Sequence, residues 1–258
     1  MPCKANLLHT SLVLALLLGA LHSGHGTETV AKPPSKLWKK EEYPNPREDA
    51  TECRRNASIS WICDPDGVMT QEQADDLDDL LDKVHRNTTC ACEGDCDYPN
   101  SGFHIAIALM KEQHSDKEHK TEMDKLKETE EFARFLQVSG WDYGHCDDDA
   151  VIVVSVEYRK VWTSMGGRFK EKVSDWCVQH IYKEVRHTIW NGNVSQGLYD
   201  MIDKYGLVLS GQMECEVGIR AGSIIFILAM VSFGLCAVIS FISFFRQRFK
   251  GCGSPQRV

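Results

Sequence analysis

The apolar positions of the chain form short β-branched runs separated by longer segments of helical periodicity. The clearest run covers residues 151–156, apolar at every position except Ser155, and it closely follows the acids Asp147, Asp148 and Asp149. A run of this length predicts a strand buried on both faces, because it is too short for a helix core and far too short for a membrane span. Residues 161–163 resume the apolar pattern after a polar turn and predict a second strand.

A strand buried on both faces needs cover on both faces, and the sequence predicts helices that supply it. The first spans residues 71–85, and its apolar residues recur at helical spacing: Ala74, Leu77, Leu80, Leu81 and Val84. Thr70 and Gln73 stand at capping-box spacing, which predicts where this helix begins. Residues 103–110 predict a further strand, in which His104 is interpreted as a half-buried structural residue rather than a ligand.

Three more helices are predicted, over residues 117–138, 169–189 and 195–207, the first with Ser115 and Glu118 at capping-box spacing. The order of elements is helix, strand, helix, strand, strand, helix, helix. This order predicts an α/β (α+β) sandwich, in which a small central mixed sheet carries helices on both faces.

Both ends of the chain have patterns typical of targeting and membrane insertion. Residues 1–26 combine Lys4, an apolar stretch and small residues, which is the pattern of a secretory signal peptide. Residues 221–245 carry no charge and are long enough to cross a bilayer, and Arg246 follows at once, which predicts a cytoplasmic tail. We therefore predict a type I single-pass protein of the plasma membrane, organised as signal peptide 1–26, linker 27–42, extracellular domain 43–210, stalk 211–220, transmembrane helix 221–245 and cytoplasmic tail 246–258.

Charge and cysteine content restrict the partners and the compartment of the predicted domain. All 37 acidic residues but only 23 of the 29 basic residues fall between residues 27 and 218, and the resulting charge of about −14 disfavours nucleic acid and anionic lipid. An even number of cysteines in an oxidising compartment predicts disulfides, with the pairing left open. The eight cysteines concerned are Cys53, Cys63, Cys90, Cys92, Cys96, Cys146, Cys177 and Cys215. Zinc bound by the closely spaced cysteines of residues 90–96 is the weaker alternative.

Sites of modification are predicted on both sides of the membrane. N-glycosylation acceptor sequences begin at Asn56, Asn87 and Asn193, all within the predicted extracellular part. Cys252 lies just inside the membrane and is a candidate for reversible palmitoylation, with an unmodified thiol as the alternative.

The sequence contains none of the G-x-S-x-G, H-E-x-x-H or P-loop signatures, so we predict no catalytic residue, no cofactor and no small-molecule substrate. Gly166-Gly167 ahead of a helix could cradle an anion, although a plain turn is the favoured interpretation. We expect a binding protein rather than an enzyme.

A calcium ion is the one metal that the acidic residues suggest. Asp147, Asp148 and Asp149 could hold it together with Asp64 or Asp66. Because no EF-hand spacing is present, the favoured interpretation is that these acids cap and solubilise the end of a strand.

Several segments together resemble a known family. They are YPNPRED from residue 43, SWICDPDGVMT from residue 60, GFHIAIAL from residue 102 and CDDDAVIVVSVEYRKVWTSMGG from residue 146. Over residues 43–210 the chain resembles the extracellular domain of the modulator-of-levamisole-receptor family, which is similar to the wider TPM domain of bacterial and chloroplast proteins. The resemblance implies a sandwich of helices around a central sheet.

The same resemblance implies a function. It describes a single-pass auxiliary subunit that raises the gating of a nicotinic-type acetylcholine-gated ion channel. Some chloroplast TPM proteins are linked to acid phosphatase activity, but the wider family often shows an Asp-Arg pair where this chain has Glu157-Tyr158-Arg159-Lys160, which retains only Arg159. The alternatives to channel modulation are a cell-surface binding or adhesion domain without a channel partner and, less favoured, a TPM-type phosphatase.

Overall fold

A computed structural model describes residues 36–56, 59–89, 91–92, 102–118, 120–215, 230 and 232–244. The strands in these residues are β1 (Leu37–Trp38), β2 (Ile62–Cys63), β3 (His104–Met110), β4 (Glu112–Gln113), β5 (Asp149–Ser155) and β6 (Lys160–Met165). Four of them form one sheet in the order β2-β3-β5-β6, and β1 pairs with β4. In the larger sheet β2, β3 and β5 are parallel and β6 is antiparallel to β5, so the predicted mixed sheet is confirmed.

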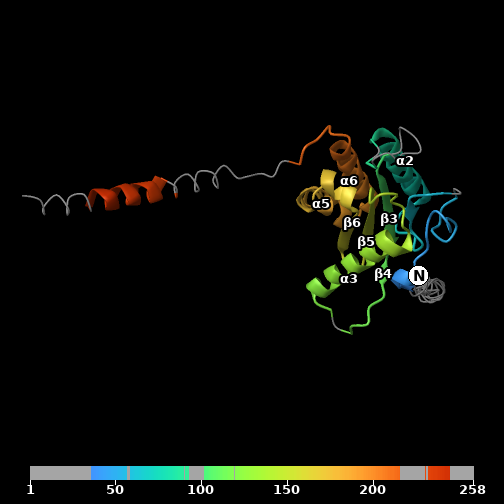
Figure 1. Cartoon of the computed structure of the whole chain (residues 1–258). Coiled ribbons are helices and arrows are strands. Elements are labelled where there is room, and N and C mark those ends of the chain that lie inside the picture. The colour runs from blue at the N-terminus through green and yellow to red at the C-terminus, as the bar shows by residue number, and fades with distance from the viewer. Residues whose placement is uncertain are drawn as a thin grey trace, which may run out of the picture. The chain divides into compact units, whose positions relative to one another are not determined.

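Helices cover both faces of this sheet (Figure 1). The helical elements are η2 (Lys40–Glu42), α2 (Gln71–Asn87), α3 (Glu122–Phe135), the π-helical η3 (Leu136–Gly140), α4 (Gly167–Lys172), α5 (Asp175–Trp190) and α6 (Val194–Leu209). One face packs with α2, α4, α5 and α6 through side chains such as Ile107 and Ile152. The other face packs with α3, η3 and the amino-terminal segment through Ala106 and Val151. The predicted α/β sandwich with helices on both faces is therefore confirmed.

The first helix and the two central strands lie where the sequence pattern places them. Thr70 and Gln73 form the predicted capping box at the start of α2, and the five predicted apolar residues of this helix are buried. Strand β5 is buried along its whole length, as its largely apolar run predicts.

Two helix boundaries differ from the prediction. Helix α3 begins after Thr121, which forms a capping box with Asp124, whereas the predicted cap residue Ser115 donates its hydroxyl to the Glu128 carboxylate (2.6 Å). The predicted helix over residues 169–189 is two helices, because Ser174 accepts a hydrogen bond from the backbone of Cys177 and starts α5 as a new helix.

The ordered domain begins before residue 43. The Trp38 side chain is buried and its indole N–H donates to Asp66 (3.1 Å), so the last residues of the predicted linker belong to the domain. The linker residues 27–35 and the signal peptide lie outside the described residues.

No helix among the described residues is long and apolar enough to cross a membrane. The predicted span 221–245 is described only at residues 230 and 232–244, and residues 246–258 lie outside the description.

Candidate functional site

The acids considered as a calcium site fall at opposite ends of the parallel strands. Asp149 starts β5 and is in register with His104, the first residue of β3. Asp64 and Asp66 follow β2, near the far end of β3, where the Tyr43 hydroxyl donates to the carbonyls of both Cys63 (3.0 Å) and Leu109 (2.6 Å). Because a strand rises about 3.3 Å per residue, the two groups are separated by roughly 15–20 Å. The structure therefore does not bring the five acids together.

Asp64 and Asp66 are engaged in fixing the turn that follows β2. Both carboxylate oxygens of Asp64 accept backbone N–H groups, from Val68 and Met69, each at 2.8 Å. Burial raises the pKa of Asp64 in spite of these two bonds. Asp66 accepts from the backbone of Lys111 (2.7 Å) as well as from Trp38. Their role in the structure is that of hydrogen-bond acceptors within the fold.

Asp147 uses its backbone carbonyl to close the start of α4. That carbonyl accepts the N–H groups of Arg168 (3.0 Å) and Phe169 (3.2 Å). A Cβ atom on Gly166 would lie 2.3 Å from the same oxygen, so only glycine allows this approach. Of the amide groups around the possible anion cradle, those of Gly166, Arg168 and Phe169 therefore donate to carbonyls of the chain itself.

Asp148 and Asp149 lie at the amino-terminal edge of the parallel strands. Asp148 accepts from the backbone of His145 (3.0 Å), and its carboxylate is 3.7 Å from the His104 imidazole. Burial favours the neutral form of Asp148, but His104 and the backbone donors outweigh it, so the pKa of Asp148 is lowered. Burial raises the pKa of Asp149 to about 6, although Gln137 donates to its carboxylate (3.0 Å).

Histidine and aromatic rings stack beside these two acids. The rings of His85 and His104 have centroids 4.4 Å apart, and Trp61 lies 5.4 Å from His104. Nδ1 of His85 is 3.0 Å from the carbonyl of Gly102. Burial, followed by the charge of His104, lowers the pKa of His85. A neutral His85 can stack against its neighbour without charge repulsion.

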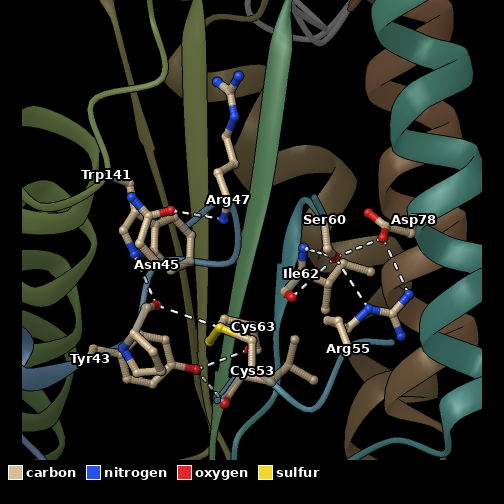
Figure 2. Close-up of a disulfide and its surroundings, with 12 residues drawn as sticks. Tyr43, Asn45, Arg47, Cys53, Arg55, Ser60, Ile62, Cys63, Asp78 and Trp141 are labelled. Atoms are coloured by element: carbon tan, nitrogen blue, oxygen red, sulfur yellow. Dashed lines mark hydrogen bonds and ion pairs between the residues drawn. A yellow bond between two sulfur atoms is a disulfide. The ribbon is translucent and has the colours of Figure 1, made fainter. Parts of the chain in front are cut away.

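The most exposed member of this group is Arg47. Its guanidinium lies 5.3 Å from the ring centres of both Trp61 and Tyr143, so the cation stacks on two aromatic faces. We call Arg47, Trp61, His85, His104 and Tyr143 the Arg47 cluster. In the described part of the chain no carboxylate forms an ion pair with Arg47, and Figure 2 shows its side chain extending away from the nearby disulfide.

Bonds among the residues that flank Arg47 fix its position. The side-chain oxygen of Asn45 accepts the Tyr143 hydroxyl (2.5 Å) and the backbone N–H of Arg47 (3.0 Å). The Trp141 indole N–H donates to the Pro44 carbonyl (3.2 Å) (Figure 2). Burial raises the pKa of Tyr143, so the phenol remains a neutral donor. The proline-rich segment is thereby held against residues nearly 100 positions away in sequence.

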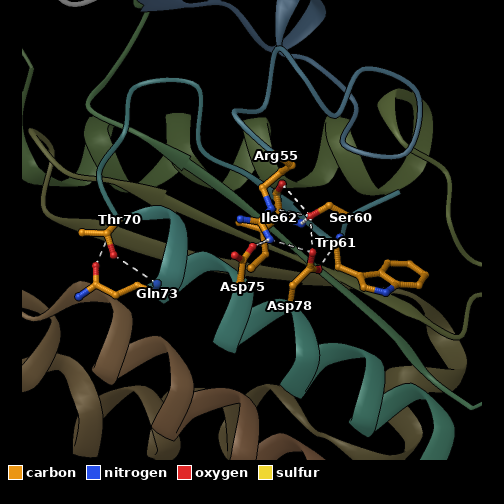
Figure 3. Close-up of polar contacts among 8 residues, drawn as sticks. All are labelled: Arg55, Ser60, Trp61, Ile62, Thr70, Gln73, Asp75 and Asp78. Atoms are coloured by element: carbon orange, nitrogen blue, oxygen red, sulfur yellow. Dashed lines mark hydrogen bonds and ion pairs between the residues drawn. The ribbon is translucent and has the colours of Figure 1, made fainter. Parts of the chain in front are cut away.

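The loop that carries Trp61 is fixed to helix α2 by a buried polar network (Figure 3). Arg55, whose side chain is 3% exposed, forms ion pairs with Asp75 (2.6 Å) and Asp78 (3.2 Å). The Ser60 hydroxyl donates to Asp78 (2.7 Å), and the other oxygen of Asp78 accepts the backbone N–H of Trp61 (2.8 Å). The aromatic surface under Arg47 is therefore held by helix α2 as well as by the sheet.

Three disulfides join the described cysteines: Cys53–Cys63, Cys92–Cys146 and Cys177–Cys215. Cys90, Cys96 and Cys252 lie outside the described residues. Cys92, Cys146 and Asp148 approach one another closely enough to hold a metal ion, but both sulfur atoms belong to the disulfide. The zinc alternative therefore loses Cys92 as a thiolate ligand.

The predicted glycosylation sites Asn56, Asn87 and Asn193 are all exposed. Asn193 also caps α6, because its side-chain oxygen accepts the backbone N–H of Gln196 (3.2 Å). The amide nitrogen of Asn193, to which a glycan would be attached, is not needed for that cap.

The Arg47 cluster was not predicted from the sequence. Arg47, Trp61 and Tyr143 are far apart in the chain, and no local spacing connects them. The only signal was indirect: Arg47 and Trp61 lie in two of the segments on which the family resemblance rests. Arginine, tryptophan and tyrosine are the residue types enriched in the hot spots of protein–protein interfaces, and here an exposed arginine is held on both aromatic types.

Comparison with known proteins adds a family and two distant structural likenesses. The family model described as modulator of levamisole receptor-1 matches residues 38–159. No curated protein matches the chain. The N-terminal domain of a protein from P. gingivalis is 17% identical over 69% of this chain and 94% of its own, with a TM-score of 0.48. A protein from the psychrophilic bacterium Bizionia argentinensis is 19% identical over 58% of this chain and 86% of its own, with a TM-score of 0.39.

Proposed function

From the match of residues 38–159 to the modulator of levamisole receptor-1 family, we propose that the chain acts as a member of this family and is an auxiliary protein of a ligand-gated ion channel. In this proposal the chain is a type I single-pass protein of the plasma membrane. Its extracellular domain binds a nicotinic-type acetylcholine-gated channel and increases channel opening. The observation that carries the proposal is the family match itself.

Two structural features support an extracellular binding role. The disulfides that join the described cysteines fit an oxidising compartment. The Arg47 cluster offers an exposed cation on rigid aromatic rings, and the channel surface that meets it would need carboxylate or aromatic groups.

The energetic requirement for such a modulator is modest. A bound protein changes gating only if it binds the open channel more tightly than the closed one, and a difference of about 1–3 kcal/mol shifts the equilibrium 5- to 150-fold. A rigid surface meets this requirement better than a flexible one, because less conformational entropy is lost on binding. The hydrogen bonds of Asn45 and the Arg55 network provide that rigidity.

We also propose that the chain acts without catalysis. Asp64, Asp66 and Asp147 are engaged in bonds that hold the fold together, which supports this part of the proposal. Incubation of the purified protein with a generic phosphoester, with and without divalent cations, should give no turnover. Turnover that depends on Asp148 or Asp149 would replace the binding role by a phosphatase role.

Agonist-evoked currents test the main proposal. A levamisole-sensitive acetylcholine-gated channel is expressed alone, with the full chain, and with the Arg47→Ala variant. We expect larger currents with the full chain and a loss of most of that increase in the variant, because the stacked cation is removed. Arg86→Ala is the matched control, since Arg86 is exposed and held only by an ion pair with Asp82 within its own helix. Currents that the full chain leaves unchanged would refute the proposal.

A further inference from the structure

The outer edge of strand β6 has no partner strand among the described residues, although Thr163 and Met165 of this strand are largely buried. Among the described strands, β6 pairs with β5 alone. The Gly166 N–H donates to the Asp149 carbonyl (2.9 Å), so these two facing residues form a hydrogen-bonded pair of the antiparallel ladder. Because bonded and non-bonded pairs alternate in an antiparallel ladder, the backbone groups of Val161, Thr163 and Met165 point away from β5. Within the described part of the chain no strand pairs with them.

Apolar walls flank this open edge. A groove of about 510 Å³ runs along β6 between α3 and α5. Leu126 from α3 lines one side, Val178 and Tyr182 from α5 line the other, and Trp162 lies between them, half-buried. Met123, one turn before Leu126, leaves 71% of its surface exposed, so the apolar face of α3 continues beyond the groove.

Ion pairs close the two ends of the groove. Lys160, the first residue of β6, pairs with Glu122 (2.8 Å), and Lys170, beyond its last residue, pairs with Asp175 (3.5 Å). Lys170 and Asp175 therefore offset each other, and Glu130 from α3 leaves one further acidic side chain in the lining. The other lining groups are the backbone of β6, the polar Gln179 of α5 and the apolar side chains on both sides.

These features specify an extended peptide. Open strand edges in soluble proteins are usually short, charged or covered, whereas β6 borders a groove to which it contributes the apolar side chains of Val161, Trp162 and Met165. A strand added to such an edge forms backbone hydrogen bonds and places its side chains alternately against the two walls. We propose that the groove beside β6 binds an extended apolar segment of about five residues by strand addition.

The connection between the domain and the predicted membrane span indicates which kind of protein supplies the bound segment. The Cys177–Cys215 disulfide fixes α5, one wall of the groove, to a cysteine six residues before the predicted span at residue 221. With the predicted span beginning at residue 221, the six residues that follow Cys215 reach at most about 20 Å, which limits the distance of Cys215 from the membrane in the proposed topology. The segment therefore belongs to a neighbouring membrane protein, and this step rests on the proposed function, which makes the channel that neighbour.

Proline at Val161 tests the backbone part of the inference. The N–H of Val161 points away from β5, so Val161→Pro removes a donor from the open edge without removing one from the ladder. Full-length chain and channel are co-expressed, and the channel captured with the chain at the cell surface is measured. We expect about tenfold less channel with Val161→Pro. Val161→Ala, which removes the side chain but keeps the donor, should change capture less than twofold.

A second variant introduces a charged side chain into the apolar lining of the groove and tests the proposal without changing the backbone of β6. Leu126→Lys should reduce channel capture by a similar factor, because a charged group would be buried by the added strand. Val138→Lys is the matched control, since Val138 is exposed and lies outside the groove. Capture that all groove variants leave unchanged would overturn the groove proposal alone, whereas no capture by the unmutated chain would overturn the proposed function with it.

A photo-crosslinking amino acid at position 126 of the full chain identifies the occupant. Crosslinks to a channel subunit support the inference. Crosslinks to a second copy of this chain, or no crosslink while the channel is still captured, would overturn it.

Discussion

Both ends of the parallel strands carry buried carboxylates, but the two ends differ in how completely these carboxylates and their polar neighbours are hydrogen-bonded. At the carboxyl end, near Asp64, both carboxylate oxygens and the Tyr43 hydroxyl have hydrogen-bond partners. At the amino end, Nδ1 of His104 and one oxygen of Asp149 are buried, and neither has a hydrogen-bond partner among the described residues. Each end also carries one disulfide, Cys53–Cys63 near Asp64 and Cys92–Cys146 before Asp149.

This difference concerns the hydrogen bonds of the two carboxylates and not every buried group, because the Ser155 hydroxyl at the carboxyl end is also buried without a hydrogen-bond partner among the described residues. A fully paired carboxylate contributes to folding because it satisfies buried donors, whereas an unpaired one costs free energy that the rest of the fold must offset. The amino end is also where the exposed Arg47 lies, in the same aromatic group as His104. Buried polar atoms without a hydrogen-bond partner and the exposed Arg47 occur together at the amino end of the parallel strands, which agrees with an interaction surface there.

The largest expected effect comes from the disulfide at the amino end. Removing Cys92–Cys146 with paired alanine substitutions should lower the free energy of unfolding by about 4 kcal/mol, because this bond closes a loop with a sequence separation of 54. The Cys53–Cys63 bond spans only 10 residues, and its removal should cost about 3 kcal/mol by the same reasoning. Urea unfolding of purified residues 36–215 measures both. A larger loss for the shorter loop would show that packing around the cysteines outweighs chain entropy.

Asp64→Ala gives the next largest effect and tests the claim that the carboxyl end stabilises the fold. It leaves the backbone N–H groups of Val68 and Met69 without their acceptor, and we expect a loss of about 3 kcal/mol in the same unfolding measurement. Asp79→Ala, at an exposed acid of α2, should change stability by less than about 0.5 kcal/mol. Equal effects of the two substitutions would remove the distinction between the two ends.

The sequence predicted the elements whose local signals agree with their packing. Helix α2 has an apolar face and a capping box that both place its start at Thr70, and residues 150–154 of β5 are all apolar. Prediction failed where two local signals compete. Both Ser115 and Thr121 stand three residues before an acid, and only the tertiary contact of Ser115 with Glu128 decides that the helix begins at the second.

The candidate site could not be predicted from local sequence patterns, for a different reason. The five acids were considered together as calcium ligands because the sequence does not specify at which end of the sheet each acid lies. Arg47, Trp61 and Tyr143 meet only because the parallel sheet and the bonds of Asn45 bring three distant segments together. Such convergence depends on topology, which hydrophobic periodicity does not specify.

Asp149→Asn tests the buried carboxylate at the amino end, in which one oxygen accepts from Gln137 and the other has no partner among the described residues. The pKa of Asp149 is raised from 3.8 to about 6 in the folded protein, so the folded state holds the proton more tightly than the unfolded state. Its contribution to stability is therefore greatest below pH 4 and is lost as the pH rises to about 6. The variant cannot ionise, so between pH 4 and pH 7 it should gain about 2 kcal/mol of unfolding free energy relative to the unmodified protein. If the free energy of unfolding depends on pH in the same way in both proteins, the raised pKa of Asp149 is contradicted.

The smallest expected change in stability belongs to Arg47, and it separates folding from binding most clearly. The guanidinium is exposed, so Arg47→Ala should lower the free energy of unfolding by no more than about 1 kcal/mol, the typical value for an exposed cation–π contact. The same substitution should remove most of the increase in channel current. Arg47→Lys keeps the charge but not the planar stacking group, so it should restore stability more fully than current. If current and stability fall in proportion across Ala and Lys, the Arg47 cluster supports the fold and is not the surface that binds the channel.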